Sequence, residues 1–169
     1  MSPETFVSTI LNPALWQASD PIGIAISQES RVLLVAIAGQ EMSWTYRLQI
    51  GAPQYGRGFW SFESAGIQAV ATHTASAAKS LALADALAIP HVLDTAHEAI
   101  AWNDVFAVGM ARLLLWTDPA PLPPVGDQQG GWSLYLRTWN PGTPRPADWP
   151  ANYTAAVRAC APRAAAPVS

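Results

Sequence analysis

Glu41 is the residue whose surroundings best suit acid–base chemistry. It follows the uncharged stretch 32–40, VLLVAIAGQ, which predicts a buried helix that ends near residues 41–43. Burial and the negative end of the helix dipole both disfavour an ionised carboxyl group, so we expect both to raise the pKa of Glu41. A carboxyl group that keeps its proton near neutral pH can protonate a leaving oxygen as a general acid. The alternative is a solvated residue at a helix end, without a chemical role.

Glu63 is a second carboxylate, at the end of the aromatic segment 58–63, GFWSFE. Glycosidases commonly use two carboxylates that flank one sugar ring. Across a cleft from Glu41, Glu63 could orient water or stabilise an oxocarbenium-like state, so we count both as candidate catalytic residues. The alternative for Glu63 is an ion pair with Arg47 or Arg57.

Three long polar side chains, Arg47, Gln49 and Arg57, lie between the two glutamates in the sequence. They could bind sugar hydroxyls or the carboxylates of a substrate. Arginine has five N–H donors, so these side chains could instead fix a loop by hydrogen bonds to carbonyl groups. We favour the structural role.

Tryptophan is abundant, with eight residues in a chain of 169. Flat apolar rings can stack on sugar faces, whereas large aromatic residues in a small domain also fill its core. We expect Tyr46, Trp60 and Trp139 to lie in a cleft, and Trp102 and Trp116 to lie in the core. The predicted substrate-binding residues are Tyr46, Arg47, Gln49, Arg57, Phe59, Trp60, Ser61, Tyr135, Trp139 and Asn140.

Composition restricts the class of protein. The chain has the length of one domain, and half of its residues are hydrophobic while only 12% are charged, which excludes disorder as its main state. The formal net charge is −3 and no basic block exists, so nucleic acid is not an expected partner. One Cys and three scattered His, interpreted as solvated or capping residues, predict no internal disulfide and no metal site.

The N-terminal sequence, MSPETFVSTILNPALWQ, has no basic segment and contains Glu4. We therefore expect no secretory signal and synthesis in the bacterial cytoplasm. The apolar stretch 99–116 is interrupted by Asn103, Asp104 and Arg112, which favours a core helix over membrane insertion.

The predicted elements are mainly helical. A helix begins after the capping residue Ser2, and a buried helix begins after Ser27. Further helices are expected over 66–72, 73–89, 95–116, 129–139 and 149–158. Segment 57–63 is predicted to form either a small β-hairpin or a tight aromatic turn. The pattern indicates a single domain over 1–162 and a flexible tail over 163–169.

Three segments occur in a recognisable order: LLVAIAGQEM, GRGFWSF and LYLRTWNPGTP. This order resembles the lysozyme-like superfamily, in particular lytic transglycosylases and goose-type lysozymes. There an apolar helix ends in a Gln-Glu-Ser step with the catalytic acid, and Gly-Leu-Met-Gln and Tyr-Asn-Ala-Gly segments follow. Glu41 matches the acid, 58–61 the second segment and 139–142 the third. The chain has Met42, Ser61 and Trp139 where the pattern has Ser, Gln and Tyr.

The chain also looks like small phage and prophage proteins of unassigned or cell-wall-degrading role, through RLQIG at 47–51 and RGFWSFE at 57–63. Together the two resemblances cover about residues 30–155. They imply a mainly α, lysozyme-like domain, with a small β-hairpin beside the cleft as an option. The implied partner is the glycan strand of peptidoglycan, and no metal or organic cofactor is implied.

The implied activity is that of a muramidase or a lytic transglycosylase, and the choice between hydrolysis and anhydro-sugar formation stays open. Its place of action would be the cell wall, as an endolysin, or a phage particle. Two other functions remain: a catalytically inactive phage structural or assembly protein, and a glycan-binding module on the same fold. The net charge of −3 disfavours electrostatic attraction to anionic peptidoglycan.

Overall fold

Two helices, α3 (Gln28–Met42) and α7 (Asp104–Trp116), form the centre of the fold in the computed structural model, which describes residues 1–52 and 55–162. Residues 32–40 of α3 and 106–115 of α7 are buried without interruption. A helix that is apolar on all sides must be covered on all sides, and both are. The buried helix predicted after Ser27 is confirmed, because the Ser27 hydroxyl accepts a hydrogen bond from the amide of Ser30 at 3.1 Å.

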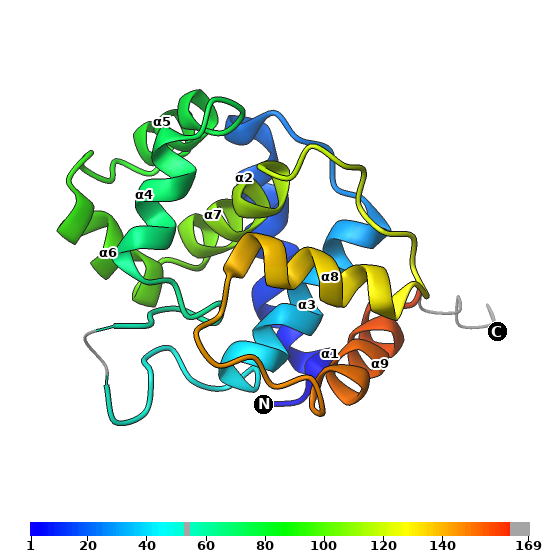
Figure 1. The fold of residues 1–169 in the computed structure, drawn as a ribbon. Helices are drawn as coiled ribbons and strands as arrows, with labels where there is room; N and C mark the ends of the chain where they lie inside the picture. The colour runs from blue at the N-terminus through cyan, green and yellow to red at the C-terminus, as the bar shows by residue number, and fades with distance from the viewer. Residues whose placement is uncertain (53–54, 163–169) are drawn as a thin grey trace, which may run out of the picture.

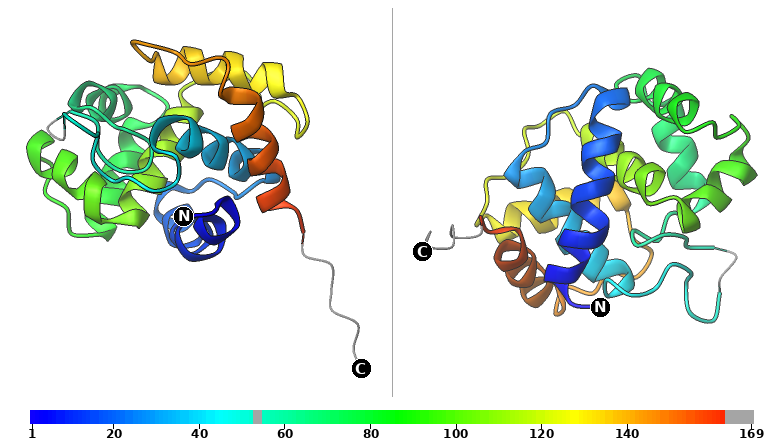
Figure 2. Two further views of the ribbon diagram at one scale, coloured as in Figure 1. Left: turned by 90° about the horizontal axis from the view of Figure 1, so that it is seen from below. Right: turned by 180° about the vertical axis from the view of Figure 1, so that it is seen from behind.

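The N-terminal segment crosses the back of the molecule as one nearly continuous rod (Figure 2, right). It consists of α1 (Pro3–Phe6), the π-helix η1 (Val7–Leu11) and α2 (Asn12–Ile22). The rod packs mainly against α7. Its buried side chains, which include Phe6 and Leu15, contribute one side of the core.

The remaining helices lie on two sides of this centre (Figure 1). On one side are α4 (Ser64–Thr72), α5 (Ala77–Ala86) and α6 (Leu93–Trp102). On the other are α8 (Gln128–Trp139) and α9 (Trp149–Cys160), with α9 packed along α3. The described residues form a mainly α single domain, and the flexible tail predicted over 163–169 lies outside them.

The prediction of a single helix over 95–116 is wrong, because two helices occupy this range. Helices α6 and α7 meet at Asn103 with a bend of 111°. Asn103 has an extended backbone, and its side-chain oxygen accepts a hydrogen bond from the amide of Phe106 at 3.0 Å. An asparagine that caps a new helix therefore ends the preceding one.

The small β-hairpin expected near residues 57–63 does not form. The described part of the chain contains two isolated antiparallel bridges there, Leu48–Arg57 and Arg57–Phe62, and no β-strand. The tight turn that the sequence offered as the alternative is present, closed by hydrogen bonds between the backbones of Arg57 and Phe62. The described residues of segment 43–63 thus lead to α4 without a strand or a helix.

His97 holds this loop in place. The prediction that it is a solvated or capping residue is wrong. Its side chain is buried, with Nε2 at 2.8 Å from the carbonyl oxygen of Tyr55 and 3.0 Å from that of Phe62. One imidazole N–H therefore faces two loop carbonyls, and that of Phe62 also accepts from the backbone amide of Arg57. Burial of His97 agrees with this role, because it brings a donor to carbonyl groups inside the fold.

Among the described residues, no single helix is long and apolar enough to cross a membrane. The bent pair α6 and α7 passes such a test by length and composition only when its two helices are taken together.

Gly58→Ala is expected to destabilise the fold by about 2–4 kcal/mol, since a left-handed backbone and a steric clash both act there. Gly58 has φ +68°, and an added Cβ would lie 2.7 Å from the carbonyl oxygen of Ile100. Gly51→Ala is the matched control, because Gly51 has φ +78° and nothing within 4 Å of an added Cβ. We expect Gly51→Ala to cost about 1 kcal/mol. Urea unfolding measures both, and equal losses would contradict the clash.

Candidate functional site

A cleft with a volume of about 710 Å³ lies between α4 and α8, above the C-terminal end of α3. This volume is within the range of about 300–1,000 Å³ typical of small-molecule sites. It brings together residues from distant parts of the sequence. The predicted site residues that line it are Glu41, Gln49, Ser61, Glu63, Tyr135, Trp139 and Asn140.

Gln40 fixes the direction in which the next residue points. Its side chain is 1% exposed and has both ends engaged. Nε2 donates to the carbonyl oxygen of Arg145 at 2.9 Å, and Oε1 accepts from Nδ2 of Asn152 at 2.9 Å. The Arg145 guanidinium in turn donates to the carbonyl oxygen of Gln40. The last turn of α3 is therefore tied to α9 and to the loop before it, which holds Glu41 against the cleft.

Tyr135 holds the carboxyl group of Glu41. Its hydroxyl donates a hydrogen bond of 2.5 Å to Oε1 of Glu41. Tyr135 is 2% exposed and stacks on Trp149 with ring centroids 5.6 Å apart and an interplanar angle of 12°. Burial and the neighbouring carboxylate raise the pKa of Tyr135, so its hydroxyl keeps the proton that it donates.

The pKa of Glu41 lies above its ordinary value. Burial is the largest cause, and the charge of Glu63 adds to it. The hydrogen bond from Tyr135 and the positive charge of Arg145 act in the opposite direction but do not cancel it. Among the described residues Tyr135 is the hydrogen-bond partner of the Glu41 carboxyl, through Oε1, and no bond to Oε2 is present. Such a group can present a proton to a bound ligand.

Tyr135→Phe is expected to raise the pKa of Glu41 further. The phenol stabilises the charged carboxylate, so its removal favours the protonated form. A ¹³C NMR titration of the side-chain carboxyl groups measures the shift, with Glu41→Gln used to assign the resonance. An unchanged or lower pKa would show that the hydrogen bond does not form in solution.

Glu41→Gln is expected to stabilise the fold at neutral pH. A pKa raised by folding means that the folded state resists ionisation of Glu41, so ionisation at high pH destabilises the native chain. Below the ordinary glutamate pKa of about 4.3 the native chain and the variant should be equally stable. The stability advantage of Glu41→Gln over the native chain should grow as the pH rises from the ordinary glutamate pKa to the folded-state pKa of Glu41, and should stay constant above it. Thermal melts from pH 3 to pH 8 test this dependence, and a constant difference would contradict it.

Glu63 lines the same cleft at the N-cap of α4 and is exposed. The alternative of a pair with Arg47 or Arg57 is wrong. Arg47 pairs with Asp104 at 2.5 Å, and Arg57 pairs with Glu98 at 3.3 Å. Within the described ranges Glu63 makes neither an ion pair nor a side-chain hydrogen bond.

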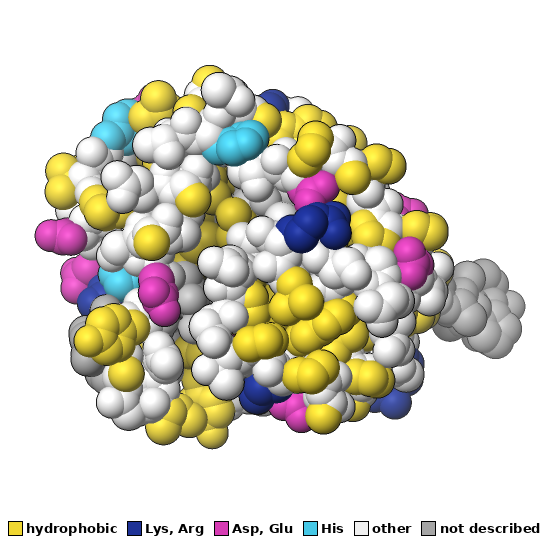
Figure 3. Space-filling view, in the orientation of Figure 1, with side chains coloured by type: hydrophobic (Ala, Val, Ile, Leu, Met, Phe, Trp, Pro, Cys, Tyr) yellow, Lys and Arg dark blue, Asp and Glu magenta, His cyan; other side chains and the backbone are white. Residues whose placement is uncertain are grey.

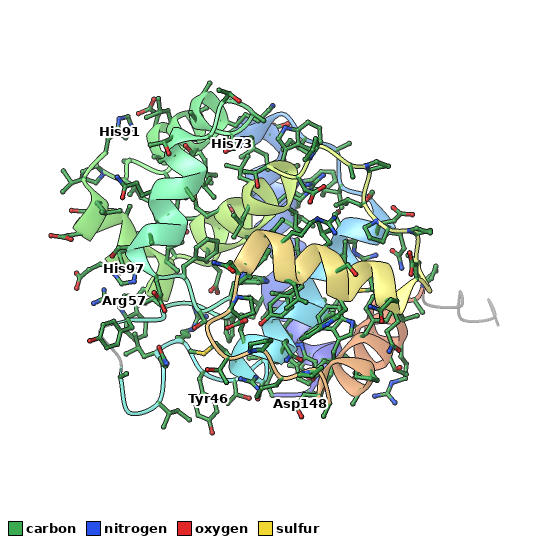
Figure 4. All side chains as sticks on the ribbon, viewed as in Figure 1. Tyr46, Arg57, His73, His91, His97 and Asp148 are labelled. Carbon is green, nitrogen blue, oxygen red and sulfur yellow. The ribbon has the colours of Figure 1, made fainter. Side chains whose placement is uncertain are left out.

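The two arginines lie outside the cleft. Arg47 also donates to the carbonyl oxygen of Ala101 at 3.2 Å and stacks over the ring of Phe59, so it ties the loop to the junction of α6 and α7. Arg57 lines a separate, shallower pocket of about 430 Å³ with His97, its neighbour in Figure 4. Their geometry agrees with the structural role that we favoured and not with contact to a ligand in the main cleft.

Aromatic residues are distributed differently from the prediction. Phe59 and Trp60 are 1% and 0% exposed, so their rings cannot stack on a ligand. Tyr46 is exposed at the edge of the molecule, away from the cleft lining (Figure 4). Trp102 and Trp116, which were expected in the core, are 69% and 43% exposed. The physical reason is that the sharp bend after Trp102 turns that residue outward, while α1 and α3 cover Trp60.

Trp139 and Asn140 line the cleft as predicted. The indole N–H of Trp139 donates to the carbonyl oxygen of Trp60 at 3.0 Å, so the backbone of the buried Trp60 positions the half-buried Trp139. Asn140 ends α8 with φ 44°, a left-handed conformation that asparagine tolerates better than most residues. Ser61 adopts φ 52° in the tight turn.

Sequence reasoning missed Thr138 and Arg145, which also line the cleft. Thr138 could have been found, because it lies three residues after Tyr135 and therefore on the same helix face. Arg145 follows a Pro-rich turn, and no local signal indicates that it returns to α3.

No group of three or more His, Cys, Asp or Glu side chains that could hold a metal ion occurs in residues 1–52 and 55–162. Comparisons of the chain with known protein families, curated proteins and solved structures found no significant match.

Proposed function

We propose that this chain cleaves the glycan strand of peptidoglycan, with Glu41 as the general acid. The observation that carries the proposal is the placement of Glu41, a carboxyl group with a raised pKa, on the wall of a cleft and held by Tyr135. Glycosidic cleavage needs a proton on the leaving oxygen, and a carboxyl group of this kind supplies one.

The lysozyme-like resemblance gives further support. It rests on residue 41 and the segments 58–61 and 139–142, which are far apart in the sequence. Glu41, Ser61 and residues 139–142 all line one cleft. A resemblance by chance would have no reason to select segments that meet at one site. The mainly α domain is compatible with the lysozyme-like fold, which we propose for this chain.

In the proposed reaction, the protonated Glu41 donates its proton to the β-1,4 glycosidic oxygen as the bond from that oxygen to the anomeric carbon breaks, while Tyr135 keeps its hydrogen bond to Oε1. The resulting carboxylate is stabilised by that phenol and by the charge of Arg145. Water, or the sugar's own 6-hydroxyl group, then bonds to the anomeric carbon and gives its proton to this carboxylate, which restores the protonated Glu41. Trp139 and Asn140 provide an apolar ring and a polar amide on the α8 side of the cleft, which suits a sugar with one flat face and several hydroxyl groups.

The test is digestion of purified peptidoglycan by the native chain, with the soluble products identified by mass spectrometry. Glu41→Gln, prepared in the same way, controls for contaminating enzymes. Anhydro-muropeptides would identify a transglycosylase, and new reducing ends would identify a hydrolase. No release from walls of several types would reject the proposal and favour the inactive structural protein or, with retained binding, the glycan-binding module.

A further inference from the structure

The charges around the cleft are unbalanced. Glu41 and Glu63 line it, and Arg145 is the cationic residue on its wall among the described residues. Arg145 is already engaged, with Nε at 3.0 Å from the carboxylate of Asp148 and a further hydrogen bond to the carbonyl oxygen of Gln40. Lys and Arg do not gather on this face, where charged side chains are scattered among hydrophobic and uncharged ones (Figure 3).

Glu63 contributes the uncompensated charge. The two arginines nearest to it in the sequence are bound to Asp104 and Glu98, so neither neutralises it. Its charge reaches Glu41 across the cleft, since it is one of the causes that raise the pKa of that residue. Apolar side chains such as Phe62 and Leu114 line the space between the walls. Because Glu63 is exposed, solvent and salt screen its field, which therefore acts on charged groups bound close to it in the cleft.

The negative charge of Glu63 acts differently on two kinds of glycan strand. Fully N-acetylated peptidoglycan presents carboxylates on its peptide stems, and on lactyl groups that carry no peptide, and Glu63 repels them. A strand that has lost N-acetyl groups presents 2-ammonium groups, which Glu63 attracts. We propose that the cleft prefers β-1,4-linked amino-sugar strands with free 2-ammonium groups, and that Glu63 selects them. The inference rests on the proposed function, and it gives the negative charge of the cleft a role in recognition.

Binding of two oligosaccharides to the full chain tests the inference. The Glu41→Gln variant imitates the protonated acid and prevents turnover. Calorimetry at about pH 5.5 and low salt compares the neutral chitin hexamer with the chitosan hexamer, whose amines are protonated. We expect the chitosan hexamer to bind about threefold to fivefold more tightly, which is the upper range for one exposed charge pair. High salt should reduce this preference.

Two double variants test whether Glu63 causes the preference for the chitosan hexamer. Adding Glu63→Gln to Glu41→Gln should remove most of the preference. Adding Glu98→Gln should leave it intact, because Glu98 makes the same charge change outside the cleft. A preference that survives Glu63→Gln would overturn the role of Glu63.

A digestion experiment tests which strand supplies the ammonium groups. The native chain digests one peptidoglycan sample before and after chemical N-acetylation. Slower digestion after acetylation identifies the wall strand, whereas unchanged digestion with a chitosan preference identifies a chitosan-type strand. Equal or tighter binding of the neutral hexamer, with peptidoglycan still cleaved, would overturn the inference and leave the proposed function standing. A chain that binds neither hexamer and also cleaves no wall would overturn both the inference and the proposed function.

Discussion

Glu41→Gln is expected to lower the rate of the proposed peptidoglycan cleavage by about 10²- to 10⁴-fold, the usual contribution of a positioned general acid. Glutamine keeps the size of glutamate and can still accept the hydrogen bond from Tyr135 through its amide oxygen. What it lacks is the proton for the leaving oxygen. The loss should therefore fall on kcat, with little change in KM, because binding of the ground state is preserved.

The rate of release of soluble fragments from labelled peptidoglycan measures this loss. Glu98→Gln is the matched control, since Glu98 is exposed, lines the separate pocket and pairs with Arg57. It should keep a rate close to that of the native chain. A Glu41→Gln variant that retains more than about a tenth of the native rate would remove Glu41 from the role of general acid.

Trp60→Ala is expected to destabilise the domain by about 3–5 kcal/mol. Trp60 is 0% exposed, and its ring lies 5.9 Å from that of Phe6 and 6.3 Å from that of Phe59, between centroids. Its indole N–H also donates to the carbonyl oxygen of Leu34 at 2.9 Å. Truncation would leave a large cavity between α1 and α3. Domains are typically stable by about 5–15 kcal/mol, so the loss is a large share of the total.

Trp102→Ala removes the same side chain from a position that is 69% exposed, and we expect a change within about 0.5 kcal/mol. Urea unfolding of both variants gives the comparison. Trp60→Phe, which keeps most of the apolar contact, provides a milder loss if the alanine variant does not fold. Similar stability of Trp60→Ala and Trp102→Ala would contradict the burial of Trp60.

Local signals predicted the parts of the fold that local physics determines. A capping serine and an uninterrupted apolar run were enough to locate α3 and to place Glu41 at its end. The helix predicted over 129–139 agrees with α8, and it carries Tyr135 and Trp139, both assigned to the site from the sequence. These predictions depend on short stretches of chain, where hydrogen bonding and hydrophobic periodicity are visible in the sequence.

Long-range contacts account for what the sequence did not predict. Whether Trp60 or Trp102 is buried depends on which helices cover it, and periodicity does not contain that information. The partner of Arg47 is Asp104, 57 positions away, and not the nearby Glu63. The hydrogen bond from Tyr135 to Glu41 joins residues 94 positions apart. The candidate site therefore depends on tertiary contacts, although seven of the residues that line it were identified individually from the sequence.

The packing of α3 against α9 has a consequence for the order of folding. Gln40 and Asn152, which bond to each other, are 112 positions apart in the chain. During synthesis the apolar surface of α3 leaves the ribosome long before the helix that covers it. Until α9 is synthesised, the face of α3 that packs on it stays uncovered, and transiently exposed apolar surface promotes aggregation. The central helix that carries Glu41 is thus a segment of the nascent chain that needs protection from aggregation.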